Sequence, residues 1–73
     1  MKWFLQVDTQ KLRRLRRRAA LSQQELAERA GTTQETISRL EHGHHAARGR
    51  TLRKLADVLN VEPKELMKGE GDD

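Results

Sequence analysis

Residues 22–41, "SQQELAERAGTTQETISRLE", contain two short amphipathic patterns of helical period that are separated by a single glycine. Ser22 and Glu25 have the spacing of a capping box, so a helix is expected to begin at Ser22. Gly31 comes directly after the last apolar residue of this pattern, where a left-handed glycine commonly ends a helix. The second pattern follows at once, which predicts two short helices joined by a tight turn.

The spacing of small and apolar residues indicates how these two helices meet. Ala27 is small enough for a close contact, and Gly31 tolerates the positive φ that the turn requires. Ile37 and Leu40 then anchor the second helix against the core. This is the spacing of a helix-turn-helix, in which the second helix enters the major groove of DNA and the first crosses the backbone.

Helical periodicity continues on both sides of this segment. The first helix is expected at about 9–20 and is capped by Asp8 or Thr9. The third begins at Thr32, in a second capping box, or at Thr33, and ends at Gly43; residues 42–49 are then a loop. A fourth helix at about 51–59 and a short fifth, from Pro63 to near Lys68, complete the set. The sequence therefore predicts an all-α domain of five helices.

The expected organisation is an N-terminal apolar arm at 1–8, the helix-turn-helix domain at 9–68 and an acidic tail at 69–73. Within the arm, Trp3, Leu5 and Val7 alternate like a short strand. The aromatic residues Trp3 and Phe4 either close the core over the first helix or form a dimer contact.

Charge is unevenly distributed along the 73 residues, whose net charge is +4. Residues 1–61 hold 13 Lys and Arg against 6 Asp and Glu, whereas residues 62–73 hold 2 against 5. A basic body with a short acidic tail favours a polyanionic partner such as nucleic acid. The alternative is a well-solvated charged surface with no such partner.

Several classes of function are excluded or disfavoured by composition. The chain has no cysteine, which excludes disulfides, cysteine-ligated zinc and thiol catalysis. His42, His44 and His45 lack the further ligands that a metal site needs. The sequence contains no pattern typical of a catalytic triad, a phosphate-binding loop or a carboxylate pair, so we expect neither an enzyme nor a cofactor. No stretch reaches membrane-spanning length, and we expect a cytoplasmic protein.

Residues 9–68 resemble the phage repressor and Cro-type helix-turn-helix domain, also called the xenobiotic-response-element-like domain. The segments "LSQQELA", "AGTTQETISRLEHG" and "TLRKLADVLNV" carry the resemblance. It implies a lambda-repressor-like fold of five helices that binds double-stranded DNA sequence-specifically, usually as a homodimer and usually as a transcriptional repressor.

The resemblance also assigns roles to individual residues. Gln23 matches a glutamine that contacts phosphate and base, and Gln34 matches one that reads adenine. The other groove-facing positions are Glu35, Ser38 and Arg39. Thr32 and Thr33 match turn residues near the DNA backbone or a thymine methyl group. Arg16 and Glu41 match a partly buried salt bridge between the first and third helices.

The chemistry of these side chains agrees with such roles. A glutamine amide donates and accepts in one plane, which suits N6 and N7 of adenine, and arginine is the best bidentate reader of guanine. Glu35 has three open roles: it accepts from cytosine N4, caps the helix, or repels phosphate at wrong sites. The arginines of the first helix other than Arg16 are expected to form a solvated face that assists electrostatic approach.

A second class of function remains open, namely a protein-interaction module such as an antitoxin or a bridging factor. In that case the apolar arm would be the surface that binds the protein partner. Binding to duplex DNA without any partner protein distinguishes the two classes.

Overall fold

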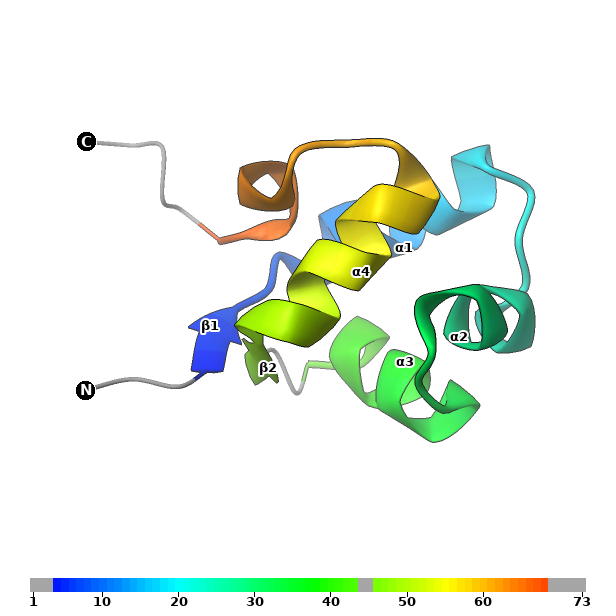
Figure 1. Ribbon diagram of the computed structural model, residues 1–73, viewed down its shortest axis with the longest axis horizontal. Coiled ribbons are helices and arrows are strands. Elements are labelled where there is room, and N and C mark those ends of the chain that lie inside the picture. Colours follow the sequence, from blue (N-terminus) through cyan, green and yellow to red (C-terminus); the bar gives the residue numbers. More distant parts are fainter. Residues whose placement is uncertain (1–3, 44–45, 69–73) are drawn as a thin grey trace.

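The computed structural model describes residues 4–43 and 46–68. These residues form four α-helices, one short 3₁₀ helix and a two-stranded sheet (Figure 1). In chain order the elements are β1 (Phe4–Gln6), α1 (Thr9–Arg18), α2 (Gln23–Ala30), α3 (Gln34–Glu41), β2 (Ala46–Arg48), α4 (Gly49–Leu59) and η1 (Pro63–Leu66). Trp3, His44 and His45 lie outside the described residues.

The turn between α2 and α3 has the features that the sequence predicts. The capping box of Ser22 and Glu25 is present in both directions, with bonds of 3.0 and 2.8 Å. Gly31 has φ 72°, in the left-handed region, and ends α2. Of the two candidate caps for α3, Thr33 is the one used, since its side chain accepts from Thr36 N at 3.1 Å. The start of α2, the end of α2 and the start of α3 are thus each determined by a local cap.

The start of α1 and the ends of α1 and α4 also have well-defined geometry. Asp8 caps α1 by accepting from Lys11 N at 3.1 Å. Asn60 ends α4 in the left-handed conformation, with φ 60°. Ala20, just after α1, also has φ 60°, which is unusual for a residue with a Cβ. The adjacent bonds, from Ala20 N to Arg17 O and from Leu21 N to Arg16 O, form the helix-ending pattern in which glycine is usual.

Replacing Ala20 with glycine is therefore expected to stabilise the protein. The left-handed conformation costs an L-residue roughly 1–2 kcal/mol, and the greater unfolded-state entropy of glycine offsets part of the gain. We expect a net increase of up to about 1 kcal/mol in the free energy of unfolding, measured by urea denaturation. Ala19→Gly is the control, since Ala19 lies in the right-handed α region with φ −82°, and this variant should lose stability. A loss of stability in Ala20→Gly would contradict the prediction.

A single core lies between the helices, and it is built almost entirely from aliphatic side chains. The buried hydrophobic residues are Val7, Leu12, Leu15, Leu21, Leu26, Ala27, Ala30, Ile37, Leu40, Ala47, Leu52, Leu55, Ala56, Leu59 and Leu66. Ala27, Ile37 and Leu40 are among them, as the spacing of the motif requires. The first helix was expected to reach about residue 20, but α1 ends at Arg18 and Ala19 is exposed.

The prediction of five helices in an all-α fold is wrong in two respects. The expected fifth helix is a 3₁₀ helix of four residues, which ends at Leu66 because Met67 is extended and bridges Val7. The expected loop at 42–49 contains β2, which pairs antiparallel with β1. Gly49 then begins α4 earlier than expected. The fold is mostly helical with a small sheet.

The arm is part of the domain in its own chain. Leu5 pairs with Ala47 across the sheet and packs against the core, and Val7 is fully buried. The other side of β1 is also engaged, because Lys68 N donates to Gln6 O at 3.1 Å. Residues 5–8 of the arm thus fold back on the core of their own chain, whereas the alternatives for Trp3 and Phe4 concern side chains outside the described part of the structure.

Candidate functional site

The outward face of α3 is polar and exposed, while its inward face is anchored in the core. Ile37, Leu40 and Glu41 are buried and define the inward direction. At about 100° per residue, Glu35 and Arg39 lie most directly opposite that direction. Ser38, which is half-buried, flanks this ridge, and Gln34, which is exposed, lies in the first turn of α3. Three of the predicted groove-facing residues therefore share one side of the helix, and Gln34 lies at its N-terminal end.

The two charged residues of this face form an ion pair with each other. Arg39 Nη2 donates to Glu35 Oε2 at 3.4 Å, one turn apart along α3. Both side chains remain exposed to solvent, 64% for Arg39 and 75% for Glu35. An exposed pair of this kind contributes little to stability, so both groups are available to an incoming partner.

The three hydroxyl residues assigned from sequence have different surroundings. Thr33 is exposed, and its hydroxyl caps α3 and lies 3.0 Å from Thr36 Oγ1. Thr32 is half-buried in the turn. Ser38 Oγ lies 3.4 Å from Nδ1 of His42, which also lies 2.7 Å from Ser38 O. Ser38 is thus partly engaged with the end of its own helix.

A buried network of hydrogen bonds connects the start of the motif to α1. Arg16 Nε donates to Glu41 Oε2 at 2.6 Å and Arg16 Nη2 donates to Glu41 Oε1 at 3.0 Å. The predicted salt bridge is therefore present; Arg16 is 13% exposed and Glu41 only 2%. Gln23 Nε2 donates to Glu41 Oε1 at 3.1 Å. Because carboxylate oxygens only accept, this contact orients the amide group of Gln23.

Opposing influences set the ionisation of this pair. Burial by itself raises the pKa of Glu41, but hydrogen bonds from Arg16 and Gln23, together with the charges of Arg16 and Arg13, outweigh it and hold the pKa below its ordinary value. The hydrogen bond to Glu41 raises the pKa of Arg16, against the effect of burial. Glu41 is thus a carboxylate and Arg16 a guanidinium at neutral pH.

Arg13 was expected on the solvated face of the first helix, and this expectation is wrong. Its side chain is half-buried, and Nη2 donates to Glu41 O, at the C-terminal end of α3, at 2.8 Å. A cation near the last carbonyl groups of a helix is favourable. Its position three residues before Arg16, on the same side of α1, is the sequence signal that could have shown this. Arg14, Arg17 and Arg18 are exposed as expected.

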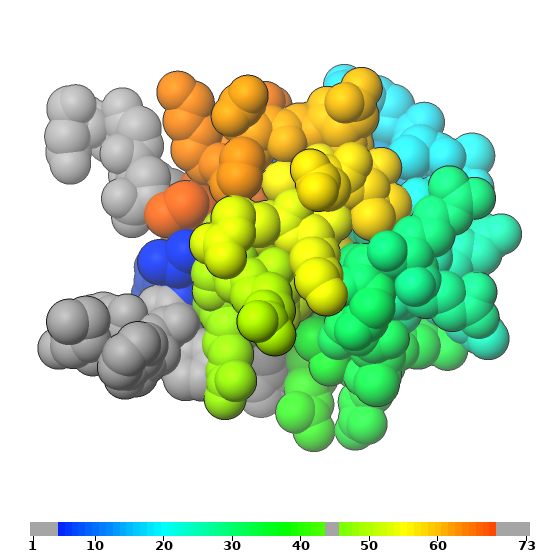
Figure 2. Space-filling model, in the orientation of Figure 1, coloured from blue at the N-terminus to red at the C-terminus, as the bar shows by residue number. Residues whose placement is uncertain are grey.

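Helix α4 supplies basic residues beside the motif that sequence reasoning did not single out. A side chain at Gly31 would place its Cβ 3.5 Å from Lys54 Nζ, so this ammonium group lies at the turn between α2 and α3. Arg50 and Arg53 line the same hollow as Lys54, with a volume of about 370 Å³. Figure 2 shows α4 at the front of the molecule beside the continuous surface of α2 and α3. The motif therefore has a positive flank.

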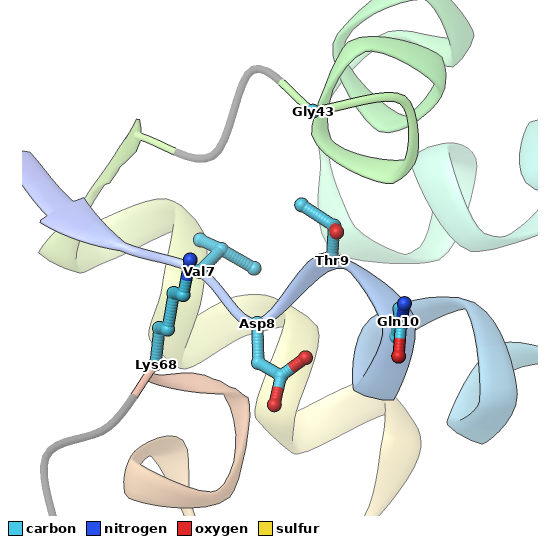
Figure 3. Close-up of a pocket in the computed structure, with 6 residues that line it drawn as sticks. All are labelled: Val7, Asp8, Thr9, Gln10, Gly43 and Lys68. Atoms are coloured by element: carbon cyan, nitrogen blue, oxygen red, sulfur yellow. The ribbon is translucent and has the colours of Figure 1, made fainter.

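A second hollow, of about 420 Å³, lies at the start of α1 (Figure 3). Asp8 and Lys68, the charged residues of its lining, point away from each other, and Asp8 is occupied as the helix cap. The lining therefore lacks the converging polar groups that mark a small-molecule site. Within the described ranges, no helix has the length and apolar character needed to cross a bilayer.

Comparisons with known proteins agree with this geometry. A family model described as "Helix-turn-helix" matches residues 12–66. The chain is similar to the restriction-modification controller protein C.AhdI from Aeromonas hydrophila, at 36% identity and a TM-score of 0.76 over 81% of this chain and 89% of that one. It is similar to the P22 c2 repressor protein, solved in complex with a synthetic operator, at 26% identity and 0.80 over 89% and 98%.

A third similar structure is that of SinR from Bacillus subtilis, a master regulator of biofilm formation, in complex with DNA. The identity is 28% and the TM-score 0.73, over 77% of this chain and 90% of that one. No curated protein matches the chain in sequence.

Proposed function

Because the chain belongs to the helix-turn-helix family, we propose that it binds a specific double-stranded DNA site through the outward face of α3 and thereby represses transcription. The observation that carries this proposal is the exposed polar ridge of α3, held on a buried aliphatic core by a left-handed glycine turn. Similarity to an operator-bound repressor and to a DNA-bound regulator supports it. A duplex partner implies that the protein acts in the cytoplasm.

Each side chain of the face has a distinct part in this proposal. Gln34 and Arg39 read base edges, with adenine and guanine as their respective partners. Ser38 and Glu35 complete the contact with the groove. Gln23, at the start of α2, donates to a backbone phosphate, where the positive end of the helix also favours an anion.

Two further groups of residues complete the proposed interface, one in the turn and one on α4. The hydroxyl-bearing turn residues Thr32 and Thr33 lie along the backbone or a thymine methyl group. Lys54 and the exposed arginines of α4 add electrostatic attraction that does not depend on sequence.

We also propose that two copies bind a palindromic site, with half-sites about 34–36 Å apart. A single recognition helix contacts only a few base pairs, so a second half-site is needed for specificity. The arm is a poor candidate for the dimer contact, because both sides of β1 are engaged within the chain. Leu66 is fully buried, whereas Val61 and Met67 are half-buried and remain available beside α4 and η1.

The test is selection of bound sequences from a random duplex pool by the intact protein, without any partner protein. The expected result is a recurring palindromic sequence whose affinity falls with increasing salt concentration. Sedimentation on the selected duplex should show two protein chains, and a promoter carrying the sequence should be repressed in cells. Recovery of random sequence only would contradict the proposed function, and one chain per palindrome would contradict the dimer.

A further inference from the structure

The central ridge of α3 is formed by an acid and a base rather than by neutral readers. Glu35 and Arg39 lie most directly opposite the buried residues of the helix, and they are joined at 3.4 Å. Gln34 lies to one side of this ridge. When such a helix lies in a major groove, the residues of its N-terminal part contact the base edges. Glu35 lies in the first turn of α3 and Arg39 one turn later on the same exposed ridge, so an ion pair faces the bases.

From this geometry we infer that Glu35 determines specificity together with Arg39, and that the two read a cytosine and a guanine in adjacent base pairs. This inference rests on the proposed DNA-binding function. Two N–H groups of the Arg39 guanidinium donate to O6 and N7 of guanine, and the Glu35 carboxylate accepts from N4 of cytosine. Because the two side chains contact each other at 3.4 Å, the two bases that they reach lie in neighbouring base pairs.

The ion pair also explains why a carboxylate is tolerable in a groove lined by phosphates. Arg39 neutralises Glu35 in the free protein, so neither side chain meets the duplex as an isolated charge. The carboxylate has no hydrogen to donate, so it cannot satisfy the acceptor edges of thymine or guanine at its own position. Glu35 thus disfavours thymine and guanine at its own position as well as favouring cytosine. Its hydrogen bond with Arg39 also orients the guanidinium group toward the neighbouring base.

The test compares the sequences selected by the intact protein and by Glu35→Gln. A glutamine amide prefers N6 and N7 of adenine, so the variant should replace cytosine with adenine at one position of the selected site. Preference for the guanine in the adjacent base pair should weaken, because the fork of Arg39 has lost its charged partner. We expect the cytosine-to-adenine preference at that position to change by about tenfold or more.

Asp57→Asn is the matched control, because it removes one negative charge from an exposed position of α4. Asp57 lines the same hollow as Arg53 and Lys54, beside the motif and on another helix than Glu35, so its replacement changes the charge near the interface without changing α3. The control should bind all duplexes slightly more tightly without changing the preferred sequence. Glu35 is exposed, so its replacement is not expected to unfold the protein.

The outcomes separate this inference from the proposed function. If the intact protein selects no sequence, the proposed function fails. If it selects a sequence and Glu35→Gln selects the same one, with affinity raised equally for all duplexes as in Asp57→Asn, Glu35 is only a surface charge and the inference is overturned. Loss of cytosine preference, with adenine in its place, supports it.

Discussion

Replacing Glu41 with alanine is expected to lower the free energy of unfolding by about 3–5 kcal/mol. The substitution leaves the guanidinium group of Arg16 mostly buried, without the carboxylate that accepts two of its hydrogen bonds. It also removes the acceptor of Gln23. A domain of this size has a total stability of roughly 4–11 kcal/mol, so the loss is a large fraction of the whole. Urea denaturation followed by circular dichroism measures it.

A double-mutant cycle separates the pair from other effects. Arg16→Met alone should also destabilise, since it leaves Glu41 buried with less compensation and removes the bond to Leu21 O. Replacing the two residues together, by methionine and leucine, should cost much less than the sum of the single changes, because no unpaired charge remains. Additive losses would show that the two side chains are not coupled.

The pH dependence of stability gives an independent measurement of the same carboxylate. The pKa of Glu41 lies below its ordinary value of 4.5, so the unfolded chain takes up the proton first as pH falls. Its stabilisation is therefore complete at neutral pH, begins to decline near the ordinary value, and is lost below the depressed one. The stability difference between the intact protein and Glu41→Gln should stay constant from about pH 7 to 5.5 and shrink below about pH 5.

Glu25 does not disturb this comparison. The backbone hydrogen bond from Ser22 lowers its pKa too, but it is present in both proteins and cancels in the difference. A stability difference that stays constant down to pH 3 would contradict the assignment to Glu41.

The local features of the motif could be predicted from sequence because they depend on neighbouring residues. The capping box of Ser22 and Glu25 and the glycine end at Gly31 depend on a few neighbouring residues, and both occur as expected. Helical periodicity likewise predicted the fourth helix, whose buried residues are Leu52, Leu55, Ala56 and Leu59.

The features that sequence reasoning missed depend on contacts between distant segments. Residues 46–48 have no strong strand pattern, and they form β2 because β1 lies beside them. The chain after Leu66 is extended because Met67 meets Val7, about sixty residues earlier in the chain. Arg13 was predicted to be solvated, like the neighbouring arginines, because its acceptor, Glu41 O, belongs to another helix. Gln23 was assigned to DNA, and no local pattern revealed its bond to Glu41.

Replacing Arg39 with alanine is expected to weaken binding to the selected duplex by about 1–3 kcal/mol and to remove the preference for guanine at one base pair. Gln34→Ala should have an effect of similar size at a different base pair, where adenine is preferred. Both residues are exposed on α3, so their removal should leave the urea denaturation midpoint nearly unchanged. Competition binding against duplexes substituted one base pair at a time measures the loss at each position.

Two further variants distinguish base reading from general attraction. Gln23→Ala should weaken binding to all duplexes about equally, because a phosphate contact carries no sequence information. Since Gln23 is neutral, this loss should leave the salt dependence of binding unchanged. Gln24→Ala is the matched control: this exposed glutamine lies 3.4 Å from Glu28 Oε2 and has no assigned DNA contact. If Arg39→Ala and Gln34→Ala keep the ratio of specific to random binding, α3 does not read bases in the proposed way.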